Sequence, residues 1–379
     1  MREVVIIDGV RTPIGRAGRD QAYYKDLRAD DLGVLCVKRL LERNPAVNPA
    51  EIEDVVWGCA NQSGEQSLNI GRMIALLAGL PVEVAGTTVD RQCGSSLQAT
   101  NFAAQAIMSG AGEVAIAGGV EHMTHIPMGA GVNPHPKLLE MFPPDMFLMG
   151  MTAERLASMY HVTREASDAF ALRSNQRAVA ARERFKGEIV PVGLPSGSTV
   201  EVDQGPRAET TLEKLAALKP SFKPDGQVTA GNSSQISDGA AALLLMSAER
   251  ARAIGAKPKA RIRASAVAGV RPEIMGWGPV PASRKALARA GLGVGDIGLW
   301  EINEAFAAQV LACNTDLKID EERLNVNGGA IAMGHPLGCS GARLMVTLVH
   351  EMGRRGTPLG VATMCIGIGQ GIATVVEQV

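Results

Sequence analysis

Short apolar runs alternate with stretches of helical periodicity along the chain. Residues 4–7, 55–57 and 113–117 are compact and rich in β-branched or small apolar side chains, which predicts buried strands. Between them, apolar residues recur at helical spacing over 32–41 and 70–77. Strands that alternate with helices in this way are typical of α/β domains, in which helices cover a sheet. The pattern therefore predicts an α/β fold.

The same pattern occurs a second time. Residues 52–57 resemble 297–302, and residues 113–117 resemble 360–364. The two offsets, 297 − 52 = 245 and 361 − 114 = 247, are nearly equal. Two matches at almost one offset indicate a duplicated domain.

Between the two halves the character of the sequence changes. Residues 122–147 are rich in Gly, Pro, His and Met, which predicts irregular loop. Helices are expected over 152–160 and 163–186, each opening on a threonine cap, and residues 191–225 mix Pro, Gly and charge. An insertion of this length is usually functional. We expect an N-terminal half of residues 1–120 and 236–258, an inserted loop domain of residues 121–235, and a C-terminal half of residues 259–379.

Composition narrows the class of function. The chain has 379 residues, a formal charge of −1, and only three Trp, three Tyr and seven Phe. So small a charge and so few aromatic side chains argue against nucleic-acid binding. No apolar run reaches the length of a membrane span, and the N-terminus has no secretion signal. The six cysteines form no C-x-x-C pair, so we expect a cytoplasmic protein with free thiols.

One cysteine lies at a position suited to chemistry. Cys93 follows a short strand over 87–89 and precedes a helix over 95–108 that is apolar nearly all round, and so is expected to be buried. The unpaired N–H groups and the dipole of a helix N-terminus favour a thiolate there. Gly94 and two serines leave room for a substrate. An inert core cysteine is the alternative interpretation, and the local sequence leaves both open.

Other polar groups stand at predicted strand ends, where active sites of α/β proteins gather. Asn303 follows a strand, His335 lies in a Gly-rich loop before the helix that begins near Ser340, and Cys365 follows a buried strand. The glycines over 367–371 lead into a closing strand and not into a helix, so they do not predict a dinucleotide site. A cluster of histidines lacks metal-ligand spacing, and we expect no metal there; it comprises His122, His125 and His135, with Met123 and Met128 nearby.

Five motifs resemble those of the thiolase family, the acyl-CoA:acetyl-CoA C-acyltransferases. They are RTPIGR (11–16), VDRQCGSS (89–96), EINEAFAAQ (301–309), NVNGGAIAMGHPLGCSGAR (325–343) and ATMCIGIGQGIA (362–373). The resemblance spans essentially the whole chain. It implies a five-layer αβαβα fold built from two duplicated halves, with an inserted loop domain.

The resemblance also implies roles for individual residues. Cys93 would carry the acyl group, His335 would activate its thiol, and Cys365 would exchange a proton with the α-carbon of acetyl-CoA. Asn303, through a water, and His335 would hold the enolate oxygen. The backbone N–H groups of Cys93 and Gly367 would hold the tetrahedral oxyanion.

Coenzyme A is a substrate on this resemblance, and no cofactor is implied. Ser234 would bond the pantetheine, Phe222 would pack on it, and Arg207 would lie near the nucleotide, although a solvated surface arginine is an equal alternative for Arg207. The resemblance places four further side chains in the acyl-CoA site: Met149, Leu148, Phe306 and Met275. Biosynthetic members usually carry His at the position of Leu148 and Gly at that of Ile368, so this chain resembles the degradative, β-oxidation type.

The expected function is a 3-ketoacyl-CoA thiolase that cleaves 3-ketoacyl-CoA with CoA, as a homodimer or homotetramer or with a hydratase/dehydrogenase β-oxidation subunit. An acetyl-CoA acetyltransferase that forms acetoacetyl-CoA is the alternative. A decarboxylating ketoacyl synthase of the same fold would need two histidines with one cysteine. A non-catalytic acyl-CoA-binding subunit of a β-oxidation complex is the alternative from another class.

Overall fold

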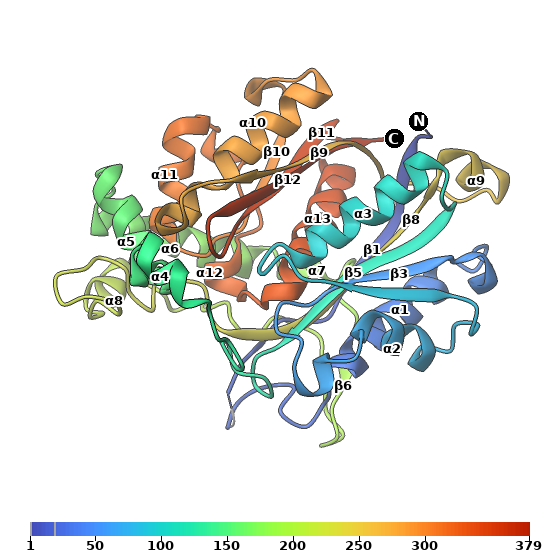
Figure 1. Ribbon diagram of the computed structural model, residues 1–379, viewed down its shortest axis with the longest axis horizontal. Helices are drawn as coiled ribbons and strands as arrows, with labels where there is room; N and C mark the ends of the chain where they lie inside the picture. Colours follow the sequence, from blue (N-terminus) through green and yellow to red (C-terminus); the bar gives the residue numbers. More distant parts are fainter. Residues whose placement is uncertain (1, 19) are drawn as a thin grey trace.

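The computed structural model describes residues 2–18 and 20–379, and its sheet consists of two similar halves (Figure 1). The N-terminal half has the order β4 (Ala85–Val89), β3 (Asp54–Gly58), β5 (Val114–His122), β8 (Ser237–Ser247) and β1 (Val4–Arg11). The C-terminal half has the order β10 (Leu299–Ile302), β11 (Leu359–Ile366), β12 (Gln370–Gln378) and β9 (Ala260–Gly269). The halves meet where β1 and β9 pair over two residues.

Strand pairing makes the duplication explicit. In the first half β3 runs parallel to β5, with Val55 opposite Ile116; in the second β10 runs parallel to β11, with Trp300 opposite Val361. The offsets are 300 − 55 = 245 and 361 − 116 = 245. The predicted duplication is therefore present. Paired residues are separated by the same number in both halves (116 − 55 = 61 and 361 − 300 = 61), so one offset serves both strands and the sequence matches at 245 and 247 are not both in register. Side chains alternate with a period of two, so a shift of two keeps the same faces buried and the hydrophobic pattern does not reveal it.

Helices cover the outer face of each half of the sheet and fill the space between the two halves, which gives the predicted five layers (Figure 1). Helices α1 (Ala29–Arg43) and α2 (Ile70–Leu77) cover the outer face of the first half, and α10 (Pro279–Ala290) and α11 (Ala307–Leu317) that of the second. Helices α3 (Ser95–Ser109) and α13 (Leu337–Arg355) form the middle layer, where both contact strands of each half. Each interface between layers holds its own apolar core.

The middle layer depends on close helix packing. Gly341 of α13 lies against the backbone of Leu97 in α3, where a Cβ atom would collide. The absence of a side chain therefore lets the two helices approach. As predicted, α3 is buried on most sides, but Phe102 is 44% exposed and lies on the same side of the helix as the exposed Gln105 and Ala106.

The segment between β5 and β8 is folded around short elements. They are α4 (Pro136–Met141), α5 (Met149–Met159), α6 (Arg164–Ala180), α7 (Arg182–Phe185), β6 (Val192–Gly193), β7 (Thr199–Val200) and α8 (Leu212–Ala216). Thr163 caps α6 as predicted, by accepting a hydrogen bond from the Ala166 N–H. Thr152 is not a cap, because α5 begins three residues earlier at Met149, and α4 interrupts the predicted loop.

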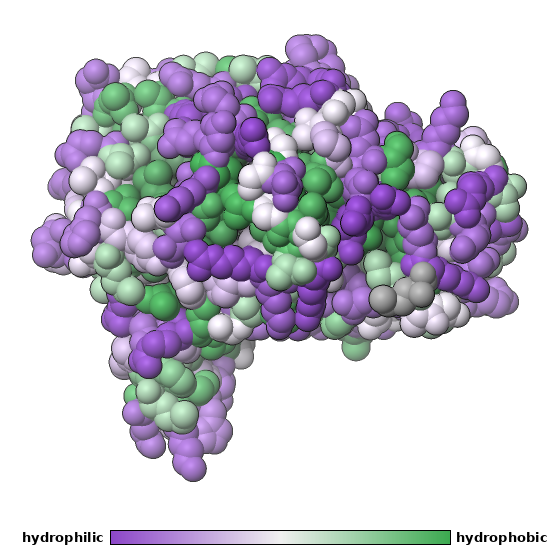
Figure 2. All heavy atoms as spheres, turned by 90° about the horizontal axis from the view of Figure 1, so that it is seen from above, coloured by the Kyte–Doolittle hydropathy of each residue, from purple (hydrophilic) through white to green (hydrophobic). Residues whose placement is uncertain are grey.

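The remaining elements are β2 (Gly15–Arg16), α9 (Ala248–Ala253), α12 (Ala330–Met333) and six 3₁₀ turns within the described residues. Seen from above, a narrow projection extends from the broad layered body (Figure 2). Over the part of the chain that the structure describes, no helix combines the length and the apolar character that crossing a bilayer requires.

Candidate active site

The turn that carries Cys93 is held in place by local hydrogen bonds and by the end of β11. The Asp90 carboxylate accepts the Gln92 N–H at 2.7 Å, and Ser95 Oγ accepts the Arg91 N–H at 2.9 Å. Gly94 is required here, because a Cβ atom would lie 2.6 Å from Ile366 Cδ1. The turn between β4 and α3 thus packs against β11, which holds Cys365 near its end.

The predicted preference of Cys93 for a thiolate is not what the structure supports. The surrounding protein raises the pKa of the Cys93 thiol to about 11, chiefly by desolvation, with smaller contributions from the Glu121 and Asp90 carboxylates. The backbone N–H groups of Gly367 and of Cys93 itself face the sulfur and act in the opposite direction. Desolvation outweighs these N–H dipoles because the side chain packs against the apolar middle layer. At neutral pH Cys93 is therefore a thiol.

His335 lies just before α13, as Cys93 lies just before α3. Its side chain is buried, with Nδ1 2.5 Å from Ser340 Oγ and Nε2 3.3 Å from Asn303 Nδ2. Burial, with a smaller effect of the Arg343 charge, lowers the pKa of His335 to about 3. The imidazole is consequently neutral and has a nitrogen available to accept a proton. Asn303 follows β10, and its Oδ1 is buried without a partner among the described residues.

Cys365 lies near the end of β11 in a small apolar cluster. Its neighbours there include Met275 and Phe306, with Met149 packed against them. Burial raises the pKa of the Cys365 thiol well above its ordinary value, and Cys93 lies close enough that its thiolate, once formed, raises that pKa further. A Cβ atom at Gly367 would lie 3.9 Å from Met149 Sδ and 4.0 Å or less from Gln92. The two cysteines therefore share one region of the molecule.

Several predicted substrate-binding residues border this region. The Ser234 N–H donates to the Ala305 carbonyl at 2.9 Å, next to Phe306. Phe222 meets Phe306 edge to face at 6.1 Å, and its ring packs against Gly150. These contacts form a partly apolar wall from the inserted segment to Cys365.

Two predicted residues lie apart from these contacts. Leu148 is 57% exposed at the start of α5. Arg207 is exposed, and its backbone N–H donates to Asn175 Oδ1 at 3.1 Å. Their roles remain predictions.

Sequence reasoning missed Glu121, which lies at the end of β5. Its buried carboxylate accepts hydrogen bonds from the N–H groups of Ala60, Asn61 and Gly338 at 2.8–3.1 Å, and from Gln66 Nε2 at 3.0 Å. Because Gly338 lies three residues after His335, this carboxylate connects the histidine loop to the first half. The available signal was an acidic residue near the end of an otherwise apolar strand.

The histidine cluster has a structural explanation. Donor atoms of Glu65, His122 and His125 lie within 4.8 Å of one another. His122 Nε2 contacts the Tyr24 carbonyl at 3.0 Å and His122 Nδ1 accepts the His125 N–H at 3.2 Å. His125 bonds the Lys25 carbonyl and the Glu65 carboxylate. All four ring nitrogens of His122 and His125 thus form hydrogen bonds that link segments of the chain. His135 instead caps α4.

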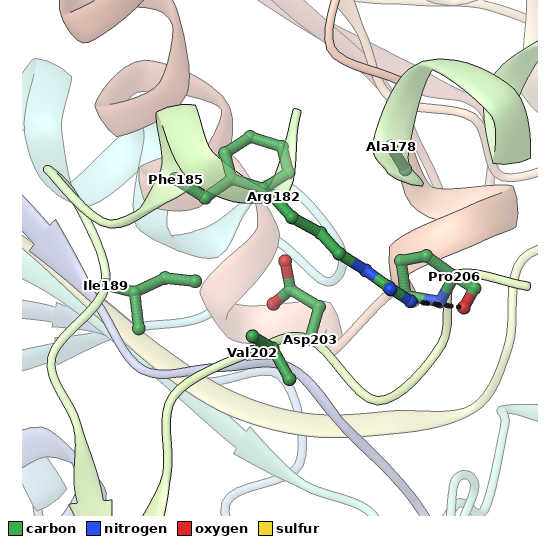
Figure 3. Close-up of a pocket in the computed structure, with 7 residues that line it drawn as sticks. All are labelled: Ala178, Arg182, Phe185, Ile189, Val202, Asp203 and Pro206. Carbon is green, nitrogen blue, oxygen red and sulfur yellow. Dashed lines mark hydrogen bonds between the residues drawn. The ribbon is translucent and has the colours of Figure 1, made fainter. Parts of the chain in front are cut away.

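A small cavity of about 10 Å³ lies among residues of the inserted segment (Figure 3). Arg182 donates to the Pro206 carbonyl at 3.4 Å beside it, and Asp203, which also lines it, pairs with the buried Arg11. The cavity has room for one water molecule. None of the predicted site residues lines it, so we assign it no role in substrate binding.

Two neighbouring cysteines, a neutral histidine and an asparagine lie at strand ends and before helices of a duplicated α/β fold, an arrangement suited to a cysteine-dependent acyl-transfer enzyme. The family models "Thiolase, N-terminal domain" and "Thiolase, C-terminal domain" match residues 4–249 and 256–378. The chain therefore belongs to the thiolase family.

Full-length relatives are similar to the chain throughout. The 3-ketoacyl-CoA thiolase of Escherichia fergusonii is 52% identical over all of both chains, and 3-ketoacyl-CoA thiolase FadA of Escherichia coli K12 is 51% identical over the same extent. Among solved structures, an acetyl-CoA acetyltransferase of Bacillus anthracis has a TM-score of 0.92 at 42% identity. The human mitochondrial 3-ketoacyl-CoA thiolase has a TM-score of 0.91 at 38% identity, and each match covers 100% of this chain and 99% of the other.

Proposed function

We propose that this protein is a 3-ketoacyl-CoA thiolase, which uses CoA to cleave a 3-ketoacyl-CoA into acetyl-CoA and a shortened acyl-CoA. The observation that carries the proposal is the shared region of Cys93 and Cys365, together with a buried, neutral His335 that contacts Asn303. Relatives that are 51–53% identical over the whole chain and named 3-ketoacyl-CoA thiolase support it.

In the first step Cys93 attacks the 3-keto carbon while His335 takes the thiol proton. The pKa of Cys93 near 11 and that of His335 near 3 disfavour a preformed ion pair. Proton transfer is therefore coupled to formation of the sulfur–carbon bond. The N–H groups of Gly367 and Cys93, which already face the sulfur, are suited to hold the tetrahedral oxyanion.

In the second step the carbon–carbon bond breaks and releases the enolate of acetyl-CoA. Cys365 donates its proton to the enolate carbon, while the protonated His335 and a water held by Asn303 bind the enolate oxygen. The raised pKa of Cys365 keeps its proton available until this moment. CoA then gives its thiol proton to the Cys365 thiolate and takes the acyl group, and Cys93 recovers a proton from His335.

The CoA moiety is proposed to lie along the inserted segment. Ser234 and Phe222 border the Cys365 region and are suited to the pantetheine. Arg207 lies close enough to Arg16 for its charge to add to burial in lowering the pKa of Arg16. Two cations at one place suit the phosphates of the nucleotide end.

The degradative subclass is the favoured one. At Leu148 the chain has an apolar side chain, and Met149, Met275 and Phe306 add apolar surface near Cys365. Such surroundings suit an acyl chain longer than acetyl. The second candidate function is that of an acetyl-CoA acetyltransferase. It is supported by the similarity of this chain to the Bacillus anthracis enzyme of that name.

We also propose a cytoplasmic homodimer without a cofactor, with the division into two halves and an inserted domain at residues 121–235. Strand β4 pairs only with β3 among the described strands, which leaves its other edge open. Near this edge in sequence are several exposed apolar side chains: Leu68, Leu77 and Val82. An open edge beside apolar side chains suits pairing with a second copy across a two-fold axis. Light scattering separates a dimer from a monomer, a tetramer or a mixed complex.

The decisive experiment compares wild type with Cys93→Ser. With a 3-ketoacyl-CoA, the wild-type protein is expected to acquire an acyl mass on the peptide that contains Cys93 and to release acetyl-CoA. Cys93→Ser is expected to give neither product. A wild-type acyl adduct on another residue, or cleavage that survives in Cys93→Ser, contradicts the proposal. Thiolysis rates from acetoacetyl-CoA upward decide between the two subclasses.

A further inference from the structure

The hydroxyl of Ser340 is the one side-chain group other than Asn303 that contacts the His335 ring among the described hydrogen bonds. Ser340 is 1% exposed and lies in the first turn of α13. It does not border Cys93 or Cys365 in any hydrogen bond of the described residues, so a role in catalysis has to be exerted through His335.

The direction of the Ser340 hydroxyl follows from its second partner. Ser340 Oγ lies 2.8 Å from the carbonyl of Pro336, four residues earlier, which is the usual helical contact for a serine side chain. A carbonyl oxygen only accepts, and a serine has a single hydroxyl proton. We assign that proton to Pro336, whose oxygen also accepts the backbone N–H groups of Cys339 at 3.1 Å and Ser340 at 2.9 Å, so that Oγ presents its lone pairs to the histidine.

The tautomer of His335 follows in turn. Nδ1 lies 2.5 Å from Ser340 Oγ, and with the Ser340 proton assigned to Pro336, Nδ1 is the donor. A neutral imidazole has one N–H, and burial keeps this ring neutral. Nε2 is then unprotonated. Asn303 Nδ2 lies 3.3 Å from Nε2 and 3.5 Å from Nδ1, so it contacts the ring without favouring either nitrogen. In the opposite tautomer the Ser340 hydroxyl would turn its proton from Pro336 to Nδ1.

We propose that Ser340 is a positioning residue that holds His335 in the Nδ1–H tautomer and so keeps Nε2 as the base for the Cys93 thiol. The inference rests on the proposed function in taking His335 as that base. In the acylation step the proton leaves the Cys93 sulfur and arrives on Nε2, while the Nδ1–H bond to Ser340 stays intact. The same Nε2–H then donates to the enolate oxygen, and its proton returns to Cys93 when the acyl group leaves.

Ser340→Ala removes the acceptor of the Nδ1–H. We expect kcat for thiolysis to fall by about 10²-fold, the lower range of what general base catalysis contributes. KM should not change, because Ser340 is buried below the site. In ¹⁵N-histidine spectra of the wild type, the His335 signals, assigned with His335→Asn, should show a protonated Nδ1 and a bare Nε2. Ser340→Ala should show a mixture of tautomers.

Two further variants separate positioning from simple structural loss. Thr347→Val removes another buried hydroxyl of the same helix, which contacts Glu188 at 3.0 Å, and should leave kcat and the His335 spectrum as in wild type. Ser340→Thr retains a hydroxyl that reaches the carbonyl four residues earlier, and should restore the tautomer and most of kcat.

The inference is overturned if wild-type His335 carries its proton on Nε2, or if Ser340→Ala retains both the wild-type spectrum and kcat. Should Ser340→Ala not fold, the wild-type spectrum and Ser340→Thr still decide. Failure of the proposed function is recognised separately, because a wild type without thiolysis still reveals its tautomer by ¹⁵N spectroscopy.

Discussion

The two halves share one strand order but use equivalent positions differently. In the first half the middle-layer helix α3 is preceded by Cys93, and in the second α13 is preceded by His335. The strand ends differ more. In the second half β10 is followed by Asn303, and Cys365 lies near the end of β11. At the end of β5 in the first half stands Glu121, which binds backbone N–H groups of both halves.

This difference shows how a duplicated fold acquires one site. The second half contributes the residues proposed as base, proton donor and enolate-binding asparagine, whereas the first contributes the proposed nucleophile and the Glu121 carboxylate. After Glu121 the first half also gives rise to the inserted segment that is proposed to bind CoA. Identical folding of the two halves is therefore compatible with different chemistry, because loops at strand ends vary without changing the sheet.

The largest expected effect separates the roles of the two cysteines. Cys365→Ala should slow the exchange of acetyl-CoA methyl hydrogens with deuterated water by about 10²–10⁴-fold, because the proton donor is lost. Acyl transfer from an acyl-CoA to Cys93 should continue, as mass spectrometry can show. Cys36→Ala, in the outer helix α1, is the control and should exchange normally. Unimpaired exchange in Cys365→Ala would show that the second half does not hold the proton donor.

The next effect concerns the Glu121 carboxylate of the first half, which binds the Gly338 N–H of the second half. Glu121→Gln replaces one carboxylate oxygen with an NH₂ group, which cannot accept the hydrogen bonds that the surrounding N–H groups donate to Glu121. This loss should lower the free energy of unfolding by about 2–4 kcal/mol. Urea denaturation measures this loss. Glu113→Gln, at a half-exposed ion pair with Arg2, should change stability by less than about 1 kcal/mol. Equal effects of the two substitutions would mean that Glu121 does not join the halves.

The pH dependence of stability tests the environment of His335. Its pKa is about 3 in the folded protein, against an ordinary value near 6.5, so the unfolded chain binds the proton first as the pH falls. The neutral ring makes its full contribution to the free energy of unfolding above pH 6.5. Between pH 6.5 and pH 3 this contribution declines by about 1.4 kcal/mol per pH unit. When the free energy of unfolding is measured by urea denaturation at a series of pH values, His335→Asn should lack this pH dependence. His135→Asn, at the exposed cap of α4, should keep it. Parallel slopes for wild type and His335→Asn would contradict a buried neutral imidazole.

The smallest effect lies at the turn after Cys365. Ile368 has φ 62° and is 42% exposed, although a β-branched residue is strained in this left-handed conformation. Ile368→Gly should relieve about 1–2 kcal/mol of strain, offset in part by the entropy of glycine in the unfolded chain. Thermal unfolding should show a modest net gain for Ile368→Gly and none for Ile368→Val. A loss in Ile368→Gly would indicate that the side chain stabilises this turn through its contacts.

Much of the site was predictable because its residues stand at local landmarks. Cys93 precedes a helix, Cys365 follows a strand, and both positions are visible in the hydrophobic pattern. Glu121 and Ser340 were not found, because their importance comes from partners on other segments or from the orientation of a single hydroxyl. Phe102 was misjudged for a related reason, since an apolar side chain does not reveal which side of a helix lacks a covering layer.

The sequence by itself determined the alternation of strands and helices, the duplication and the identities of the reactive groups, because these depend on side-chain periodicity over short stretches. Only the tertiary structure decided the protonation states. A helix N-terminus alone favours a thiolate at Cys93, yet packing against residues from the other half raises its pKa to about 11 and lowers that of His335 to about 3. Desolvation depends on what the folded chain brings together, and no local pattern contains that information.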